Sequence, residues 1–224
     1  MWLTTTNSIC FSMNQRQFAW AGIMGPTLFV VIFTLEGCFR PGYQPFSMYV
    51  SELSLGSRGW VQIVNFVVFG LLLLAFTRGV AAEFQSGKAS RGGIILLTII
   101  AICYLASGPF AMDPASTPRN QITFHGTLHG IFGAIVFSLM PVSCFVFLRR
   151  FREDPRWQFL QWWTLGLGTI IAMAVVILTV ATKLPDTQNV LHEWLGLIQR
   201  TAIVPFMIWL FIFAVGLLRR SNIG

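Results

Sequence analysis

The sequence has few charged residues and none of the short motifs that mark a soluble catalytic domain. Only 10% of the 224 residues are charged, whereas an ordinary soluble domain carries about 25%. It contains no phosphate-binding loop, dinucleotide-binding glycine pattern or nucleophile elbow. The cysteines are scattered without paired spacing, which argues against a disulfide framework or a cysteine-based metal knuckle. They are Cys10, Cys38, Cys103 and Cys144.

Apolar residues dominate what remains: 55% of the chain is hydrophobic and the mean hydropathy is +0.70. Apolar runs of about 20 residues recur, and each is long enough to cross about 30 Å of hydrocarbon. Such runs must be helical because hydrocarbon offers no water to backbone groups, and the alternation of a membrane β-barrel is absent. The sequence therefore predicts an all-α, polytopic integral membrane protein with six transmembrane helices. We place them at 18–37, 60–80, 92–111, 125–148, 158–182 and 191–217.

Charge in the loops predicts the orientation. With six spans, both termini and the second and fourth loops share a side, which carries ten Lys and Arg residues against four on the other. Positive charge marks the cytoplasmic side, so we expect a cytoplasmic segment at 1–17, a bundle at 18–217 and a cytoplasmic tail at 218–224. The net charge of +7 follows from this bias. It favours contact with anionic membrane lipids and not with nucleic acid.

The three histidines all fall at the predicted outer end, together with five of the eight acidic residues. In the stretch FHGTLHG, His125 and His129 are four residues apart and share one helix face. That spacing lets two imidazoles bind one metal ion. His192 could be a third ligand, and Asp113 a fourth ligand or a group that orients an imidazole. The pattern predicts a zinc site, since catalytic zinc commonly has three protein ligands and one water.

Two acidic residues are candidates for a general base in such a site. Glu52 or Glu193 could take a proton from a zinc-bound water. Other interpretations stay open: His129 and His192 could ligate a haem iron axially, or the polar residues could form a metal-free network for a ligand or a proton. In a purely structural interpretation, Asp113 caps a helix or turn and the outer polar residues only stabilise the bundle.

A second outer motif, SELSLGSRGWVQIVNF, begins at Ser51. Gln62 and Asn65 are three residues apart and share a polar face just below the outer surface. With Ser51 and Glu52 they could line a ligand cavity opposite the histidines. Alternatively, they form interhelical hydrogen bonds worth about 0.6 kcal/mol each.

Arg200 lies nine residues into the sixth span. An arginine at this depth costs about 2.5–3.5 kcal/mol on insertion scales, so we expect it to face inward and to have a partner. Glu36, at the outer end of the first span, is one candidate. Arg200 could anchor an anion or a lipid headgroup, or it could form a buried structural pair.

The order of the motifs SELSLGSRGWVQIVNFVVFG, SGPFAMDP and HGTLHG resembles the membrane family known as domain of unknown function 998 (DUF998). The resemblance covers about residues 20–215 and supplies no reaction. It implies a multi-span protein of a bacterial or archaeal cytoplasmic membrane. It also implies that Ser51, Glu52, Asp113, His125 and His129 match family motif positions.

The chain is more weakly similar to membrane hydrolases that include the alkaline ceramidases and adiponectin receptors. These combine Ser, Asp and three His around an intramembrane zinc. They have seven spans and carry their paired histidines on the last one, whereas the histidine pair of this chain is on the predicted fourth span.

Three classes of function remain. The first is a membrane protein with an outward-facing polar site for a ligand or metal, which as an enzyme would be a metal-dependent hydrolase of a lipid or amphiphile. The second is a non-catalytic subunit that binds membrane lipids, a membrane-protein partner or further copies of itself. The third is a transporter, for which the sequence shows no polar path through the inner half.

Overall fold

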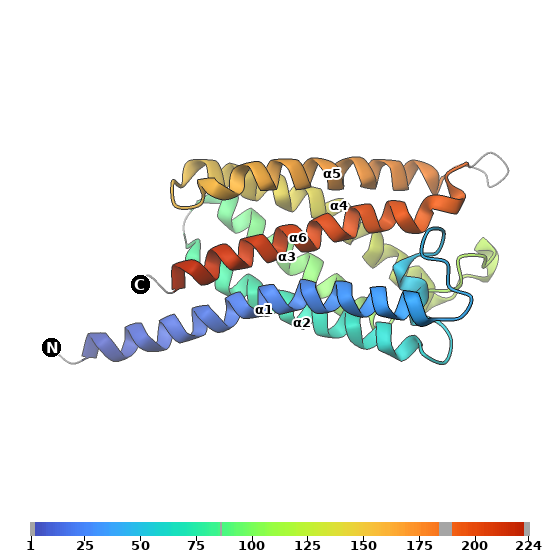
Figure 1. The fold of residues 1–224 in the computed structure, drawn as a ribbon, viewed down its shortest axis with the longest axis horizontal. Coiled ribbons are helices and arrows are strands. Elements are labelled where there is room, and N and C mark those ends of the chain that lie inside the picture. The colour runs from blue at the N-terminus through green and yellow to red at the C-terminus, as the bar shows by residue number, and fades with distance from the viewer. Residues whose placement is uncertain (1–2, 86, 184–189, 222–224) are drawn as a thin grey trace.

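The computed structural model describes residues 3–85, 87–183 and 190–221. Six long helices run through it and no strand occurs within these ranges (Figure 1). Each helix contains a stretch long and apolar enough to cross a membrane. This confirms the prediction of an all-α, six-span membrane protein. The helices are α1 (Leu3–Phe39), α2 (Gly59–Glu83), α3 (Lys88–Ser107), α4 (Phe124–Glu153), α5 (Gln161–Ala181) and α6 (Leu195–Ser221).

Short 3-10 helices lie in the connections between these spans. They are η1 (Val50–Ser54), η2 (Arg119–Gln121), η3 (Gln158–Leu160) and η5 (His192–Trp194). The prolines within α1, α4 and α6 leave those helices continuous, as membrane helices tolerate.

Some helix ends differ from the predicted ones. Helix α1 begins at Leu3, so most of the predicted N-terminal segment is helical. Helix α3 ends at Ser107, four residues before the predicted end. The reason lies in the Gly108–Pro109 pair that follows, because proline has no N–H to continue a helix. Helix α4 continues to Glu153, beyond its apolar run.

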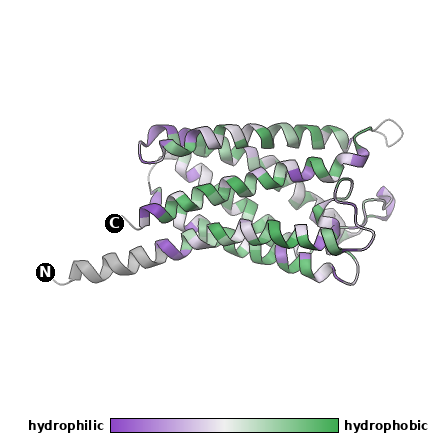
Figure 2. Cartoon of the chain, in the orientation of Figure 1, coloured by the Kyte–Doolittle hydropathy of each residue, from purple (hydrophilic) through white to green (hydrophobic). Residues whose placement is uncertain are grey.

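The helices form a ring in chain order, in which α6 packs against α1 and closes the circle. The two termini lie at one end, called the terminal end, and the α1–α2, α3–α4 and α5–α6 connections lie at the other, called the distal end (Figure 1). Figure 2 shows mostly apolar residues along the middle of the bundle and polar residues at both ends. That pattern fits a membrane crossing; the assignment of the terminal end to the cytoplasm stays a prediction from loop charge.

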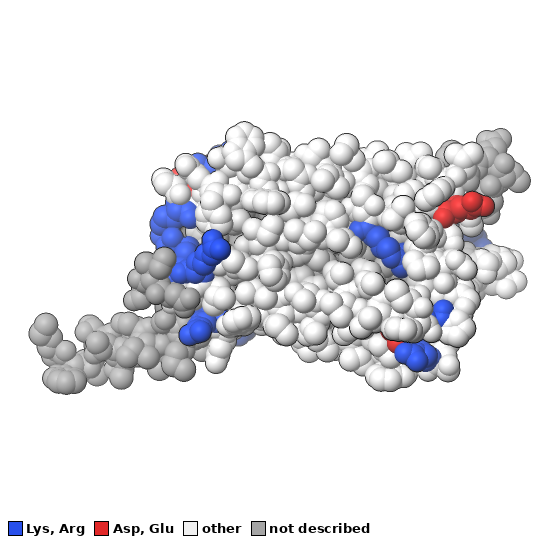
Figure 3. All heavy atoms as spheres, in the orientation of Figure 1, with Lys and Arg blue, Asp and Glu red and all other residues white. Residues whose placement is uncertain are grey.

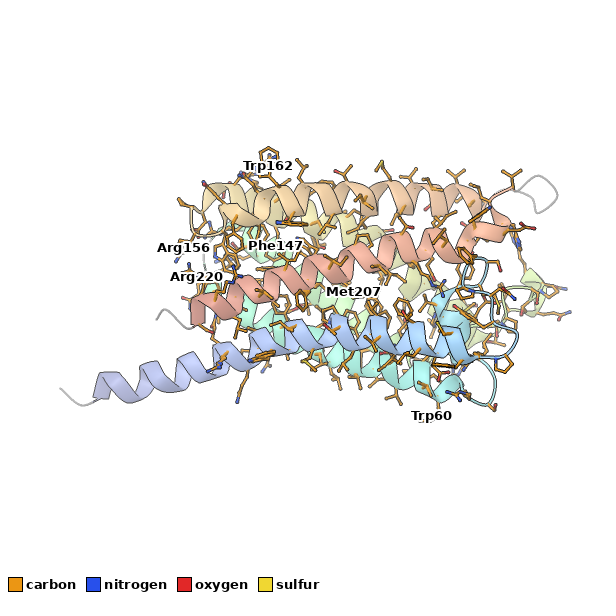
Figure 4. All side chains as sticks on the ribbon, in the orientation of Figure 1. Trp60, Phe147, Arg156, Trp162, Met207 and Arg220 are labelled. Carbon is orange, nitrogen blue, oxygen red and sulfur yellow. The ribbon has the colours of Figure 1, made fainter. Side chains whose placement is uncertain are left out.

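Aromatic side chains fill the interior of the ring near the terminal end. Ring centroids lie 5.0 Å apart for Phe84 and Trp157 and 5.1 Å apart for Phe147 and Phe213, and all four side chains are buried. In contrast, Trp162 points away from the bundle (Figure 4). This aromatic cluster fills the interior of the ring near the terminal end.

Candidate functional site

A cavity of about 480 Å³ occupies the distal half of the ring. This volume lies within the range of about 300–1,000 Å³ typical of small-molecule sites. Its wall is largely apolar, and none of the described residues that line it is an Asp, Glu, Lys or Arg. The polar lining residues are Tyr49, Ser51, Tyr104, Ser107, His129, Ser138, Thr179, Thr182 and Gln199.

The cavity opens sideways between α4 and α5. Its lining residues from these two helices include exposed ones, such as Ala134 and Thr179. Its lining residues from α1, α2, α3 and α6 are buried, for example Phe29 and Ile203. An occupant can therefore enter from the side of the bundle, where the lipid chains would lie.

Glycines keep this opening wide. A Cβ atom added at Gly130 or Gly133 would meet no heavy atom within 4 Å, and both residues line the cavity. At Gly126, in contrast, a Cβ atom would lie 2.0 Å from a carboxylate oxygen of Asp113 in the α3–α4 connection.

His129 contributes an imidazole to the cavity from the second turn of α4. Its Nδ1 lies 2.8 Å from the backbone carbonyl of Phe110. A carbonyl only accepts hydrogen bonds, so Nδ1 carries the hydrogen and Nε2 of the neutral ring is an acceptor. The backbone carbonyl of Ser107 also interacts with this imidazole. The side chain is 8% exposed, so a ligand inside the cavity could donate to it.

Gln199 and Tyr49 are cavity residues that the sequence analysis missed. Gln199 Oε1 accepts a hydrogen bond of 2.8 Å from the backbone N–H of Val50, while its amide N–H groups have no partner within the described ranges. Burial and the nearby charge of Glu52 raise the pKa of Tyr49 to about 12, so its hydroxyl stays protonated at neutral pH. Gln199 could have been found, since it is a polar residue in an apolar span beside Arg200.

Ser51 is the predicted ligand-binding residue of η1 that lines the cavity. The first two turns of α6 bind the loop that precedes η1. The Leu197 N–H donates to the Phe46 carbonyl over 2.8 Å. Arg200 Nη1 donates to the Pro45 and Met48 carbonyls over 2.7 and 3.0 Å. Together with the bond from Gln199, these contacts place Ser51 at the cavity wall.

Glu52, Gln62 and Asn65, which could have lined a ligand cavity, are not among the residues that line this one. The Glu52 carboxylate accepts from the N–H of Tyr49, 2.8 Å away. Asn65 donates to the carbonyl of Phe29 on α1 over 3.1 Å and to Gln62 over 3.2 Å. The interhelical hydrogen bond expected as the alternative is therefore present.

Asp113 holds the start of α4. Its carboxylate accepts from the Thr123 N–H over 2.7 Å and from the Thr123 hydroxyl over 3.0 Å. The Thr123 hydroxyl in turn caps α4 by accepting from the N–H of Gly126. A negative charge is favourable at this end of a helix, so the structural role predicted for Asp113 fits its contacts.

The four predicted zinc ligands do not come together. His125 is exposed and lies against the ring of Phe110, and His192 is exposed on η5 beside Glu193. Across the described residues, no three His, Cys, Asp or Glu side chains form a group that could hold a metal ion. This arrangement supplies no donor set for zinc, and zinc binding remains a prediction from the sequence. Elemental mass spectrometry of the purified protein beside His129→Ala tests it.

The acidic residues nearby have other partners. Glu36, considered as a partner of Arg200, instead pairs with Arg58 and with Arg40. Arg200 is part-buried and does not line the cavity. Within the described part of the chain no carboxylate forms an ion pair with it.

No curated protein and no solved structure shows a significant match to the chain. One family profile matches residues 23–216, which include all six spans apart from the outermost turns of α1 and α6. The motif order predicted this match. The chain belongs to the family described as "Protein of unknown function (DUF998)".

Proposed function

We propose that this protein binds an amphiphile with an uncharged polar group in the distal cavity. The polar group lies among Ser51, His129 and Gln199, and the hydrocarbon chain leaves the bundle between α4 and α5. The observation that carries the proposal is the cavity itself: it has an apolar wall, an uncharged set of hydrogen-bonding groups and a sideways opening. On the predicted orientation the ligand comes from the outer leaflet.

The chemistry of the wall selects an uncharged group. Burying an ion without a partner costs far more than burying a hydrogen-bonded neutral group, and the described lining residues offer no countercharge. His129 Nε2 can accept from a hydroxyl or amide of the ligand. The amide N–H groups of Gln199 can donate to a carbonyl or hydroxyl oxygen. These complementary groups suit a hydroxyl, ester or amide headgroup.

The position of the aromatic cluster favours binding over transport. A transport path would have to continue from the cavity toward the terminal end. There the interior is filled by side chains that are fully buried, including Phe147, Phe151 and Phe213. The cavity thus has the form of a blind pocket with a lateral mouth, which suits a binding protein or an enzyme acting on a membrane-embedded substrate.

The test uses a photoactivatable monoacylglycerol with a diazirine in its chain, an uncharged amphiphile, added to the protein in nanodiscs. Gly133→Leu places a side chain in the mouth of the cavity, where the backbone has room for it. Gly166→Leu is the matched control, because Gly166 also has open space around it but does not line the cavity. We expect labelling of α4 and α5 that falls fivefold or more in Gly133→Leu and not in Gly166→Leu.

Equal labelling of both folded variants and the wild type would overturn the proposal. A second readout is the set of lipids that copurify with the protein, measured by liquid chromatography and mass spectrometry. A ligand held in the cavity should be depleted in Gly133→Leu. If the copurified lipids are the same in all three proteins, the cavity does not retain an amphiphile.

A further inference from the structure

A second binding surface lies on another side of the ring, in the seam between α1 and α6. A hollow of about 300 Å³ near the distal end is lined by Phe33, Thr34, Arg200 and Val204, among others. A second hollow, of about 230 Å³, is lined by Thr27, Val31, Val204, Met207, Ile208 and neighbours. Because both hollows include Val204, they follow one another along the seam and form one groove. Figure 4 shows Met207 between α6 and α1.

We propose that this seam groove binds an anionic glycerophospholipid, with its phosphate on Arg200 and an acyl chain along α6 toward Phe211. The site is separate from the distal cavity: Arg200 does not line the cavity, and His129 and Gln199 do not line the groove.

The hydrogen bonds of Arg200 leave donors for an anion. Nη1 donates to the carbonyls of Pro45, Met48 and Gly196, and Nη2 donates to the hydroxyl of Tyr43. A guanidinium has five N–H groups. The Nε–H and one Nη2–H therefore have no partner among the described residues, which leaves two charged donors for the oxygens of a phosphate.

Arg200 also has no anionic partner among the described residues. Its partners are three carbonyls, the Tyr43 hydroxyl and the aromatic rings of Phe33 and Tyr43, all without a formal charge. Figure 3 shows positive charge within the otherwise uncharged middle of the face that α1 and α6 present. An isolated cation beside hydrocarbon is costly, and a lipid phosphate at this depth would neutralise it.

The length of the groove matches one leaflet. From Arg200 to Phe211 is eleven residues of α6, or about 16 Å at 1.5 Å per residue. Arg220, near the other end of α6, is twenty residues from Arg200, or about 30 Å, which is the full thickness of a hydrocarbon core. Arg200 can therefore lie at the edge of the core, and not nine residues below it as the predicted span implied. The groove then covers one leaflet of about 15 Å. Below Arg200 the lining is apolar apart from Thr27, whose hydroxyl donates to the Ile23 carbonyl. The groove thus has a cationic end and an apolar part long enough for an acyl chain. This combination suits a phospholipid better than a free anion, which has no chain to fill the apolar part.

The test measures lipid retention by native mass spectrometry, titrating phosphatidylglycerol or phosphatidylcholine of equal chain length. Thr34→Trp and Ile208→Trp fill the two hollows from exposed positions, where a larger side chain does not disturb the core. Val176→Trp is the control, because Val176 is 62% exposed on α5 and lines neither site. Arg200 itself is left intact, since it also holds the loop before η1.

We expect the wild type to retain phosphatidylglycerol at least fivefold more strongly than phosphatidylcholine. Each groove variant should remove this preference, and Val176→Trp should keep it. Equal retention of the two lipids by the wild type would overturn the proposal of an anionic ligand. Unchanged preference in both groove variants, or loss of preference in the control, would overturn the assignment to the seam. If Gly133→Leu alone lost the preference for phosphatidylglycerol, the lipid would lie in the distal cavity instead.

Discussion

The contact between α6 and the loop before η1 predicts that Gly196→Ala destabilises the protein. A Cβ atom at residue 196 would lie 2.3 Å from the Met48 carbonyl oxygen, 2.6 Å from that of Pro45 and 2.9 Å from that of Phe46. These are backbone atoms and cannot rotate away as a flexible side chain could. The loop must therefore move off the first turn of α6, and its hydrogen bonds to α6 must lengthen.

The expected loss of unfolding free energy follows from the hydrogen bonds between this loop and α6. Two come from the charged Arg200 and are worth about 1.5–3 kcal/mol each, and two neutral ones are worth about 1 kcal/mol each. Because the loop shifts without detaching, we expect about half of the summed free energy of these four hydrogen bonds to be lost. Alanine recovers at most about 1 kcal/mol of helix propensity. The net loss should then be roughly 1.5–4 kcal/mol.

Equilibrium unfolding in mixed dodecyl maltoside and dodecyl sulfate micelles measures this loss, with Gly130→Ala as the matched control. A Cβ at Gly130 meets nothing within 4 Å, so that variant should be neutral or gain up to about 1 kcal/mol. Hydrogen exchange of the Val50 N–H, which Gln199 accepts, reports the loop directly. Wild-type stability and unchanged Val50 protection in Gly196→Ala would refute the reasoning, as would an equal loss in Gly130→Ala.

Two further predictions concern the ends of the bundle. Hydrogen bonds and charge from Arg156, aided by Arg150, lower the pKa of Asp154 to about 2. A carboxylate with a lowered pKa stabilises the fold above its unfolded pKa of 3.8 and loses this effect as pH falls toward 2. The stability advantage of the wild type over Asp154→Asn should therefore be constant above about pH 5 and shrink below pH 4; an advantage independent of pH would contradict this. Asp113→Ala should lower stability by about 1 kcal/mol and speed amide exchange at Thr123, while Asp113→Asn, which keeps one acceptor, should lie between it and the wild type. Unchanged exchange at Thr123 in the alanine variant would show that Asp113 does not hold this helix start.

The sequence was sufficient for the helices but not for most of the site. Apolar runs define each span because hydrocarbon demands a continuous helix, and only the ends were misplaced, as at Ser107. His129 was singled out as a candidate metal ligand because it lies four residues from His125, and the structure places it at the cavity wall. Its partner is the Phe110 backbone carbonyl, and every residue has a carbonyl, so no sequence pattern could single it out.

The errors concern residues whose role depends on chain segments far apart in sequence. Glu52 was expected to face the histidines, but it closes its own turn through the N–H of Tyr49. Arg200 was expected to have a partner, for which Glu36 was one candidate, but its described hydrogen-bond partners are a phenol and carbonyls of the α1–α2 connection and of α6 itself. Loop carbonyls carry no sequence signature. Only the tertiary arrangement shows that they reach α6.

One loop connects the two proposed sites. Gln199 and Arg200 are consecutive on α6, so they project about 100° apart around the helix axis. Gln199 lines the distal cavity, whereas Arg200 lies in the seam groove. Both hold the same loop, through Val50 and Met48 respectively. A shift of that loop should therefore weaken both sites together, whereas a side chain that fills one opening should affect one site. Gly196→Ala should therefore reduce both monoacylglycerol labelling and the preference for phosphatidylglycerol. Gly133→Leu should reduce only the labelling, and Thr34→Trp should reduce only the lipid preference. This pattern would distinguish the role of the loop from the roles of the two openings.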